Sequence, residues 1–130
     1  MVLDTSAILA VLFAEAERDR FIALLADDDD PVLSAATLVE ASIVVQARTG
    51  DDGVVDLDEL LAVAGVRCVA VDVTQAQLAR EAFARFGKGR APAGLNLGDC
   101  FSYALAKAMD RPLLFKGADF VRTDVTPAAV

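Results

Sequence analysis

Four acidic residues occupy positions from which a folded chain could bring their side chains together: Asp4, Glu40, Asp99 and Asp119. Asp4 directly follows the apolar pair Val2-Leu3, which predicts a short buried strand. Asp119 comes soon after a second predicted strand, residues 112–115, and Asp99 stands at the start of the helix predicted over residues 97–109. In parallel α/β sheets the functional crevice lies beyond the carboxyl ends of the strands. We therefore expect these carboxylates to meet at that edge.

Glu40 lies inside an otherwise apolar segment that predicts a helix over residues 34–48. The run Thr37-Leu-Val-Glu40 also matches a capping box, in which Glu40 would return to the backbone N–H of Thr37. That arrangement requires the helix to begin at Thr37. If the helix begins near Ser34, Glu40 is on a half-buried face, where a carboxylate needs a cation or strong hydrogen bonds to offset its desolvation. The sequence leaves both interpretations open.

The other acids also have purely structural interpretations. Asp4 can cap the helix that follows it, and Asp99 can form a capping pair with Asn96 at a helix N-terminus. Asp124 competes with Asp119 for the fourth place in the cluster. What favours a functional site is the combination of three acids at strand ends or helix starts with a fourth in a helix.

A cluster of carboxylates requires a compensating charge. Carboxylates that converge without partners repel one another and raise one another's pKa values. A hard divalent cation removes that repulsion, and all-oxygen ligands are those that Mg²⁺ or Mn²⁺ prefers. The chain contains no histidine, which excludes histidine general-base catalysis and most zinc sites. The sequence therefore predicts a Mg²⁺ site, which Mn²⁺ can also occupy, formed by Asp4, Glu40, Asp99 and Asp119.

Charge is distributed unevenly along the chain. The net charge is −8, which by itself argues against a nucleic-acid partner. Residues 85–122, however, contain seven basic and three acidic residues, so this segment carries +4 and the rest carries −12. Scattered, solvated basic side chains would give the same count, but a local phosphate-binding surface is compatible with it. The candidate residues for such a phosphate-binding surface are Arg85, Lys88, Arg90 and Lys116.

The elements that must position these residues alternate between short apolar strands and helices. Strands are predicted at residues 2–3, 32–33, 66–71 and 112–115, with helical stretches between them. The pattern predicts a three-layer α/β sandwich whose central, mostly parallel sheet is flanked by helices, in a single domain spanning residues 1–130. Cys68 and Cys100 are expected to be buried free thiols. With no long apolar run and no basic leader, we expect no membrane segment and a cytoplasmic location.

Four segments in the expected order resemble PIN domains, specifically the VapC-type toxins of bacterial toxin–antitoxin pairs. The resemblance begins at Met1-Val-Leu-Asp4-Thr-Ser6 and continues at Ser34-Ala-Ala-Thr-Leu-Val-Glu40. It is carried further by Gly94-Leu-Asn-Leu-Gly-Asp99-Cys-Phe-Ser-Tyr-Ala-Leu-Ala and by Pro112-Leu-Leu-Phe-Lys116-Gly-Ala-Asp119-Phe. It covers essentially the whole chain.

This resemblance implies a fold, an activity and partners. The family's acids fall on Asp4, Glu40, Asp99 and, as the least constant of them, Asp119, while Ser6 matches a small hydroxyl residue that supports the metal site. The implied activity is Mg²⁺-dependent endoribonuclease cleavage of RNA. The implied partners are a VapB-type protein antitoxin and a second copy in a homodimer. This chain has Lys116 where many relatives have Thr or Ser after the last strand, so the family's local phosphate contacts do not carry over to this position, although a lysine can itself bind phosphate.

Two other classes of protein share some of these features. A phosphoacceptor receiver domain has similar length, acidity and layout, but it needs paired acids after its first strand, where this chain has Asp4 alone. A catalytically silent interaction domain would use all four acids as helix caps. It predicts no rise in melting temperature with Mg²⁺, whereas a metal site predicts stabilisation by linkage.

Overall fold

The computed structural model describes residues 1–128, which form a four-stranded parallel sheet with five helices. The sheet has the strand order β3-β2-β1-β4, and Val2 at its centre pairs with both Val32 and Leu113. The predicted α/β architecture with a parallel sheet is confirmed. The elements are β1 (Val2–Leu3), α1 (Thr5–Leu12), α2 (Arg18–Ala26), β2 (Val32–Ser34), α3 (Ala35–Val63), β3 (Arg67–Val69), α4 (Val73–Phe86), α5 (Leu97–Met109) and β4 (Leu113–Leu114).

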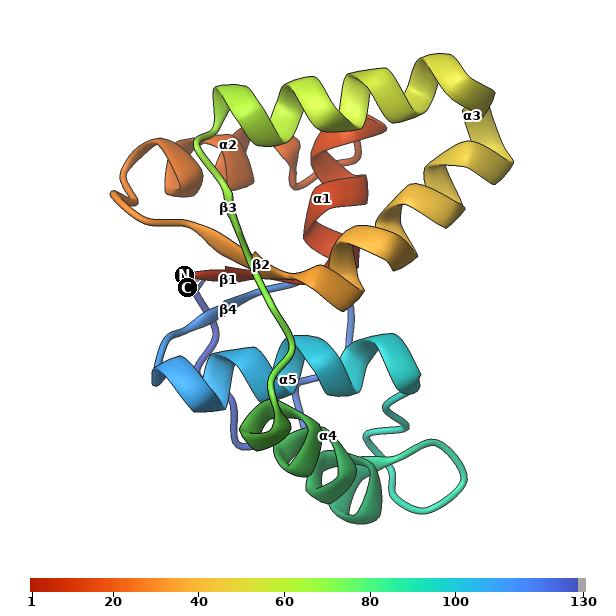
Figure 1. The fold of residues 1–130 in the computed structure, drawn as a ribbon, viewed down its shortest axis with the longest axis vertical. Coiled ribbons are helices and arrows are strands. Elements are labelled where there is room, and N and C mark those ends of the chain that lie inside the picture. Colours follow the sequence, from red (N-terminus) through yellow and green to blue (C-terminus); the bar gives the residue numbers. More distant parts are fainter. Residues whose placement is uncertain (129–130) are drawn as a thin grey trace.

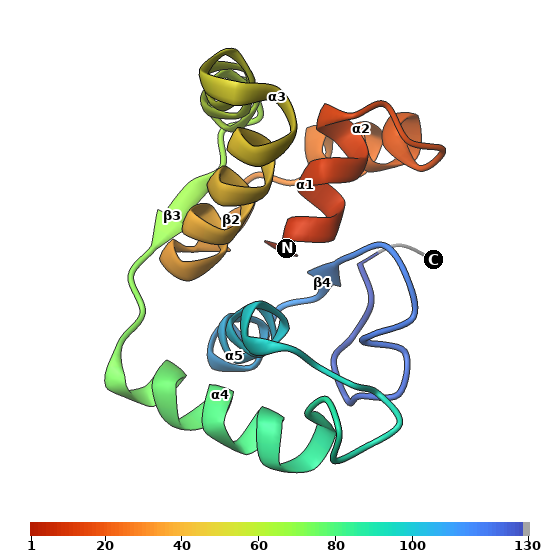
Figure 2. The same cartoon turned by 90° about the vertical axis from the view of Figure 1, so that its right-hand side faces the viewer.

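The helices cover both faces of the sheet, which gives the predicted three layers. Helices α1, α2 and α3 lie on one face, and α4 and α5 lie on the other (Figures 1 and 2). Successive strand residues point to opposite faces. Leu3, Leu33 and Leu114 accordingly join the core beneath α1–α3. Val2, Val32 and Leu113 join the core with α4 and α5. The alternation of these short strands therefore anchors both helical layers to one sheet.

Helix α3 bends sharply at Gly50. There φ is +72°, a left-handed conformation that L side chains rarely adopt, so glycine suits the bend. The predicted helix over residues 34–48 is confirmed by the first arm of α3. After the bend, the second helical arm begins at residue 51 and ends at Val63. Figure 1 shows the two arms of α3 meeting at an angle on the right of the molecule.

Strand β3 corrects two predictions. It is parallel, as expected, but it is not buried, because it is the edge strand of the sheet and pairs on one side only. Cys68 on this strand is consequently exposed, so the prediction of a buried thiol is wrong there, whereas Cys100 is buried as expected. Ile43 on α3 is also exposed.

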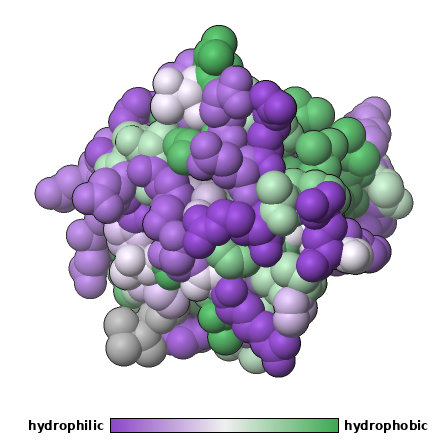
Figure 3. Space-filling view, turned by 90° about the horizontal axis from the view of Figure 1, so that it is seen from below, coloured by the Kyte–Doolittle hydropathy of each residue, from purple (hydrophilic) through white to green (hydrophobic). Residues whose placement is uncertain are grey.

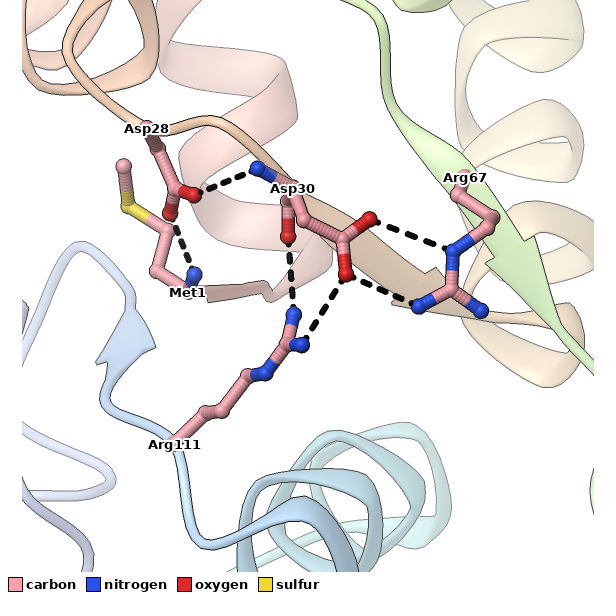
Figure 4. A network of polar contacts seen from close by, with 5 residues as sticks. All are labelled: Met1, Asp28, Asp30, Arg67 and Arg111. Atoms are coloured by element: carbon pink, nitrogen blue, oxygen red, sulfur yellow. Dashed lines mark hydrogen bonds and ion pairs between the residues drawn. The ribbon is translucent and has the colours of Figure 1, made fainter.

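A network of charges ties the amino edge of the sheet together, at the end opposite to the strand-end acids (Figure 4). Asp30, just before β2, accepts hydrogen bonds from Arg67 of β3 and pairs with Arg111, which precedes β4. Arg67 and Arg111 share one carboxylate oxygen of Asp30, and a guanidinium nitrogen of each lies 2.9 Å from it. The two guanidinium groups, Arg67 first, lower the pKa of Asp30 to about 2. The α-amino group of Met1 pairs with the neighbouring Asp28.

None of the helices in residues 1–128 combines the length and the apolar character that crossing a membrane requires.

Candidate functional site

Asp4 lies where the sequence places it, directly after β1 and at the N-cap of α1. Its Oδ2 accepts hydrogen bonds from the backbone N–H of Ser6 at 3.0 Å and from Ser6 Oγ at 2.7 Å. The side chain is nevertheless almost fully buried, with 3% of the residue exposed. The capping and functional interpretations of Asp4 are therefore compatible, because a carboxylate held by a helix start has a defined direction.

Glu40 reaches the same edge from α3. That helix begins at Ala35 with Ser34 as its N-cap, so Thr37 is not the cap and the capping-box interpretation of Glu40 is wrong. Glu40 is half-buried, and Thr5 Oγ1 donates a hydrogen bond to its carboxylate. Gly98 of α5 packs against this carboxylate of Glu40. This contact brings an acid from α3 next to the N-terminus of α5.

Asp99 lies at the N-terminus of α5 and has a raised pKa. It belongs to a capping box with Asn96 at the start of α5, and 7% of the residue is exposed. Burial raises the pKa of Asp99 to about 7, the negative charges of Asp4, Asp119 and Glu40 raise it further, and the Asn96 backbone N–H opposes this by lowering it. The other three predicted acids thus act electrostatically on this one side chain.

The two candidates for the fourth acid, Asp119 and Asp124, have different surroundings. Asp119 is exposed in the turn after β4, and its charge contributes to the raised pKa of Asp99. Asp124 instead accepts a hydrogen bond from Tyr103 Oη at 2.6 Å and lies 3.1 Å from Lys107 Nζ. Those partners lower the pKa of Asp124, although its burial acts in the opposite direction. Asp124 therefore has a structural role elsewhere in the fold.

The donor set suits a hard divalent cation, although it is not assembled around one. Within the described residues 1–128, no three acidic or cysteine side chains form a ready-made metal cluster. Carboxylate oxygens of Asp4 and Glu40 accept hydrogen bonds from hydroxyl groups, and a carboxylate oxygen of Asp99 accepts one from the backbone N–H of Asn96. A buried carboxylate beside three others favours either a proton or a cation. All-oxygen donors of this kind fit Mg²⁺ or Mn²⁺, so the chemistry of the residues agrees with the predicted metal.

Gly98 offers a direct test of the Glu40 position. A Cβ at Gly98 would lie 1.7 Å from Glu40 Oε2, which is far inside contact distance. Because Glu40 is flexible at its tip and alanine favours helices, Gly98→Ala should keep the fold and its melting temperature while displacing the carboxylate. We expect a reduced metal-induced rise in melting temperature, measured by thermal denaturation with and without Mn²⁺. An unchanged metal response would exclude Glu40 from the metal site.

The basic candidates are not gathered around the acids. Arg85 lies 3.7 Å from Asp124 Oδ2 and stacks on the Phe86 ring, while Lys88 and Arg90 are exposed in the loop between α4 and α5. This loop lies on the same side of the molecule as the N-terminus of α5 (Figures 1 and 2). Lys116 is closer to the site, since its backbone N–H donates to Ser6 Oγ at 2.9 Å. Its ammonium group, however, pairs with two carboxylates of the α1–α2 segment, those of Glu15 and Glu17.

Sequence reasoning did not identify two buried hydroxyls at the site, those of Thr37 and Ser102. Ser102 Oγ donates to Asp4 Oδ1 at 2.6 Å, and Thr37 Oγ1 lies 3.3 Å from Ser102 Oγ. One signal was available: Ser102 follows Asp99 by three residues and therefore shares its helix face. Its partner Asp4 is 98 residues away in the sequence, so the pairing itself was not apparent.

Comparison with known proteins identifies the family of this chain. The family model described as the PIN domain matches residues 1–125. The chain therefore belongs to the PIN-domain family. This assignment removes the receiver-type alternative.

Similar proteins place the chain more narrowly, among the VapC proteins. Ribonuclease VapC30 of Mycobacterium tuberculosis strain H37Rv is 48% identical over 130 residues, covering 100% of this chain and 99% of that protein. Ribonuclease VapC of Mycolicibacterium smegmatis is 50% identical over 125 residues, covering 96% and 97% respectively. The crystal structure of M. tuberculosis VapC20, described as a sarcin-ricin loop cleaving toxin, has a TM-score of 0.79 at 18% identity and covers 99% of this chain and 98% of that one. That structure confirms the PIN-like fold.

Proposed function

We propose that this chain is a Mg²⁺-dependent endoribonuclease that acts as the toxin of a type II toxin–antitoxin pair. The observation that carries the proposal is the buried Asp99, whose pKa is raised by burial and by the charges of three further acids at the carboxyl edge of a PIN fold. The proposal is supported by relatives of about the same length that are named VapC ribonucleases.

The metal-binding residues in this proposal are Asp4, Glu40, Asp99 and Asp119. Bound Mg²⁺, or Mn²⁺ in its place, would supply positive charge beside the scissile phosphate and would lower the pKa of a coordinated water. The chain's own contribution is to hold the carboxylates in a partly buried pocket, where electrostatic interactions are stronger than in water. Ser6 supports the site by holding Asp4 Oδ2. Cleavage would release the 3′-oxygen and leave a 5′-phosphate on the downstream fragment.

RNA would be held by basic side chains outside the acid cluster. Arg85, Lys88 and Arg90 are exposed at the end of α4 and in the following loop, on the side of the molecule where α5 begins. Lys116 is next to the site but would have to exchange Glu15 and Glu17 for phosphate oxygens. Contacts of this kind bind the backbone without reading its sequence. Selectivity would come from unpaired bases in an RNA loop.

The proposal includes two protein partners: a VapB-type antitoxin that inhibits the enzyme, and a second copy of the chain in a homodimer. Support for protein contacts comes from large apolar side chains that are exposed, including Val39 and Ile43 of α3, Phe83 of α4 and Leu97 of α5. Seen from below, the surface is mainly hydrophilic but carries hydrophobic patches (Figure 3). Sedimentation of the purified chain would test the dimer.

The function is tested with purified chain that has been unfolded and refolded to release any bound inhibitor. The chain is incubated with total RNA in Mg²⁺, in Mn²⁺ or in EDTA, and the fragment ends are mapped. We expect discrete fragments with 5′-phosphates in either metal and none in EDTA. Intact RNA together with a melting temperature insensitive to Mg²⁺ would support a silent interaction domain instead. Cleavage undiminished by EDTA would exclude the metal mechanism.

A further inference from the structure

Two buried hydroxyl groups form a series of hydrogen bonds that ends on Asp4. Ser102 of α5 is 0% exposed and Thr37 of α3 is 1% exposed. Ser102 Oγ donates to Asp4 Oδ1 at 2.6 Å, and its oxygen lies 3.3 Å from Thr37 Oγ1. The three groups come from three separate elements, the β1–α1 junction, α3 and α5. These buried hydrogen bonds therefore connect both helical layers to the carboxylate of Asp4.

The hydrogen bonds in this series have a defined direction. A serine hydroxyl has one hydrogen and two acceptor positions, whereas an ionised carboxylate only accepts. Because Ser102 gives its hydrogen to Asp4, Thr37 must be the donor to Ser102. Hydroxyls elsewhere in α3 behave differently: Ser42 and Thr49 donate to the carbonyl groups four residues earlier in the helix, at 2.7 Å and 2.9 Å. The Thr37–Ser102 pair is thus directed at the site rather than at its own helix.

The second oxygen of Asp4 is held in the same way from the other side. Oδ2 accepts from the backbone N–H and from Oγ of Ser6, and Ser6 Oγ accepts from the backbone N–H of Lys116 at 2.9 Å. The carboxylate therefore receives three hydrogen bonds, two on Oδ2 and one on Oδ1. A carboxylate has about four lone-pair positions. Within residues 1–128, these bonds leave one position, on Oδ1, for a cation.

We propose that Ser102, supported by Thr37, is a positioning residue that orients Asp4 so that Oδ1 presents its remaining lone pair to the metal. This inference rests on the proposed function. A hydroxyl is well suited to the task, because it donates to the carboxylate without adding a positive charge that would compete with the cation. Groups of this kind that orient a metal ligand typically change metal affinity or activity by about 10–100-fold when they are removed.

The test uses Ser102→Ala, Thr37→Val and the double variant that combines these two changes. The controls are Thr37→Ser and Ser42→Ala. Thr37→Val removes the hydroxyl at nearly constant shape, Thr37→Ser keeps it, and Ser42→Ala removes a hydroxyl of α3 that bonds only to its own helix. The measurements are kcat and KM on a short RNA, and the rise in melting temperature caused by Mn²⁺ alone. The second measurement does not depend on catalysis.

We expect Ser102→Ala to lower kcat by about 10–100-fold with little change in KM, and to shrink the Mn²⁺-induced shift. Thr37→Val should have a smaller effect in the same direction, Thr37→Ser should restore wild-type behaviour, and Ser42→Ala should match the wild type. The double variant should be no worse than Ser102→Ala, because Thr37 acts only through Ser102.

A wild-type kcat and metal response in Ser102→Ala would overturn the proposal, as would additive losses in the double variant. If Ser102→Ala does not fold, the comparison of Thr37→Val with Thr37→Ser decides in its place. A wild-type chain that responds to Mn²⁺ but does not cleave RNA would contradict the proposed function alone, and the variants' metal response would still test the positioning role. A wild-type chain without any metal response would overturn both.

Discussion

Asp99→Asn is expected to reduce Mg²⁺-dependent RNA cleavage by more than about a hundredfold, since loss of groups that merely orient metal ligands costs about 10–100-fold. Asparagine keeps the shape of the side chain but removes the negative charge that would bind the cation. It also retains an oxygen that can accept from the backbone N–H of Asn96, so the helix cap survives. The expected result is a folded but inactive protein, measured as kcat on RNA together with the melting temperature.

The matched control for this variant is Asp58→Asn, the same chemical change at an exposed position in the second arm of α3. It should cleave RNA at the wild-type rate. Full Mg²⁺-dependent cleavage by Asp99→Asn would exclude the acid cluster as the metal site and leave the activity without an explanation. If the Asp99→Asn protein fails to fold, Asp119→Asn is tested in its place, because Asp119 is exposed and its substitution should leave the core intact.

The second large effect concerns stability in the absence of metal: the free energy of unfolding should fall as the pH rises from about 4 to about 8. The folded-state pKa of Asp99 is raised to about 7, mainly by burial, from an ordinary value of 3.8. Between these values the folded state binds a proton that the unfolded state has lost, so raising the pH removes the folded state's advantage. Thermal unfolding in EDTA should show a melting temperature several degrees lower at pH 8 than at pH 5.5.

Two controls isolate Asp99 in this experiment. Asp99→Asn removes the titrating group, so its melting temperature should change little over the same interval and should exceed that of the wild type at pH 8. Adding Mg²⁺ should raise the wild-type melting temperature most at pH 8, because the cation binds the ionised carboxylates. Acids with lowered pKa, such as Asp30 at about 2, have the opposite sign, but their contribution is lost only as the pH falls below about 4. A melting temperature independent of pH in the wild type would contradict the raised pKa of Asp99.

Much of the fold and the outline of the site could be predicted from the sequence because they depend on local patterns. Helix α5 has the predicted bounds 97–109, since an Asn–Asp capping pair marks its start and apolar periodicity its extent. The parallel sheet follows from short apolar strands separated by helices. The topology then brings the acids after β1 and β4 and at the start of α5 to one edge. For this reason the strand-end acids could be grouped without any knowledge of distances.

Tertiary structure decided the features that depend on partners far away in the chain or on a place within the sheet. The position of β3 at the sheet edge exposes Cys68, although the strand's own sequence is typical of a buried one. Asp124 is paired with Tyr103 and Lys107, whereas the charge of Asp119 acts on Asp99.

The same limit applies to the hydroxyl groups around Asp4. In the sequence, Ser102 and Thr37 look like ordinary helix residues. Only the packing of α3 and α5 against β1 makes them donors in one buried series of hydrogen bonds. The sequence by itself determined which residues could be ligands, because side-chain chemistry and strand ends are local properties. The orientation of those ligands was decided by the tertiary fold, because a hydrogen bond between residues 98 positions apart exists only once the layers have packed.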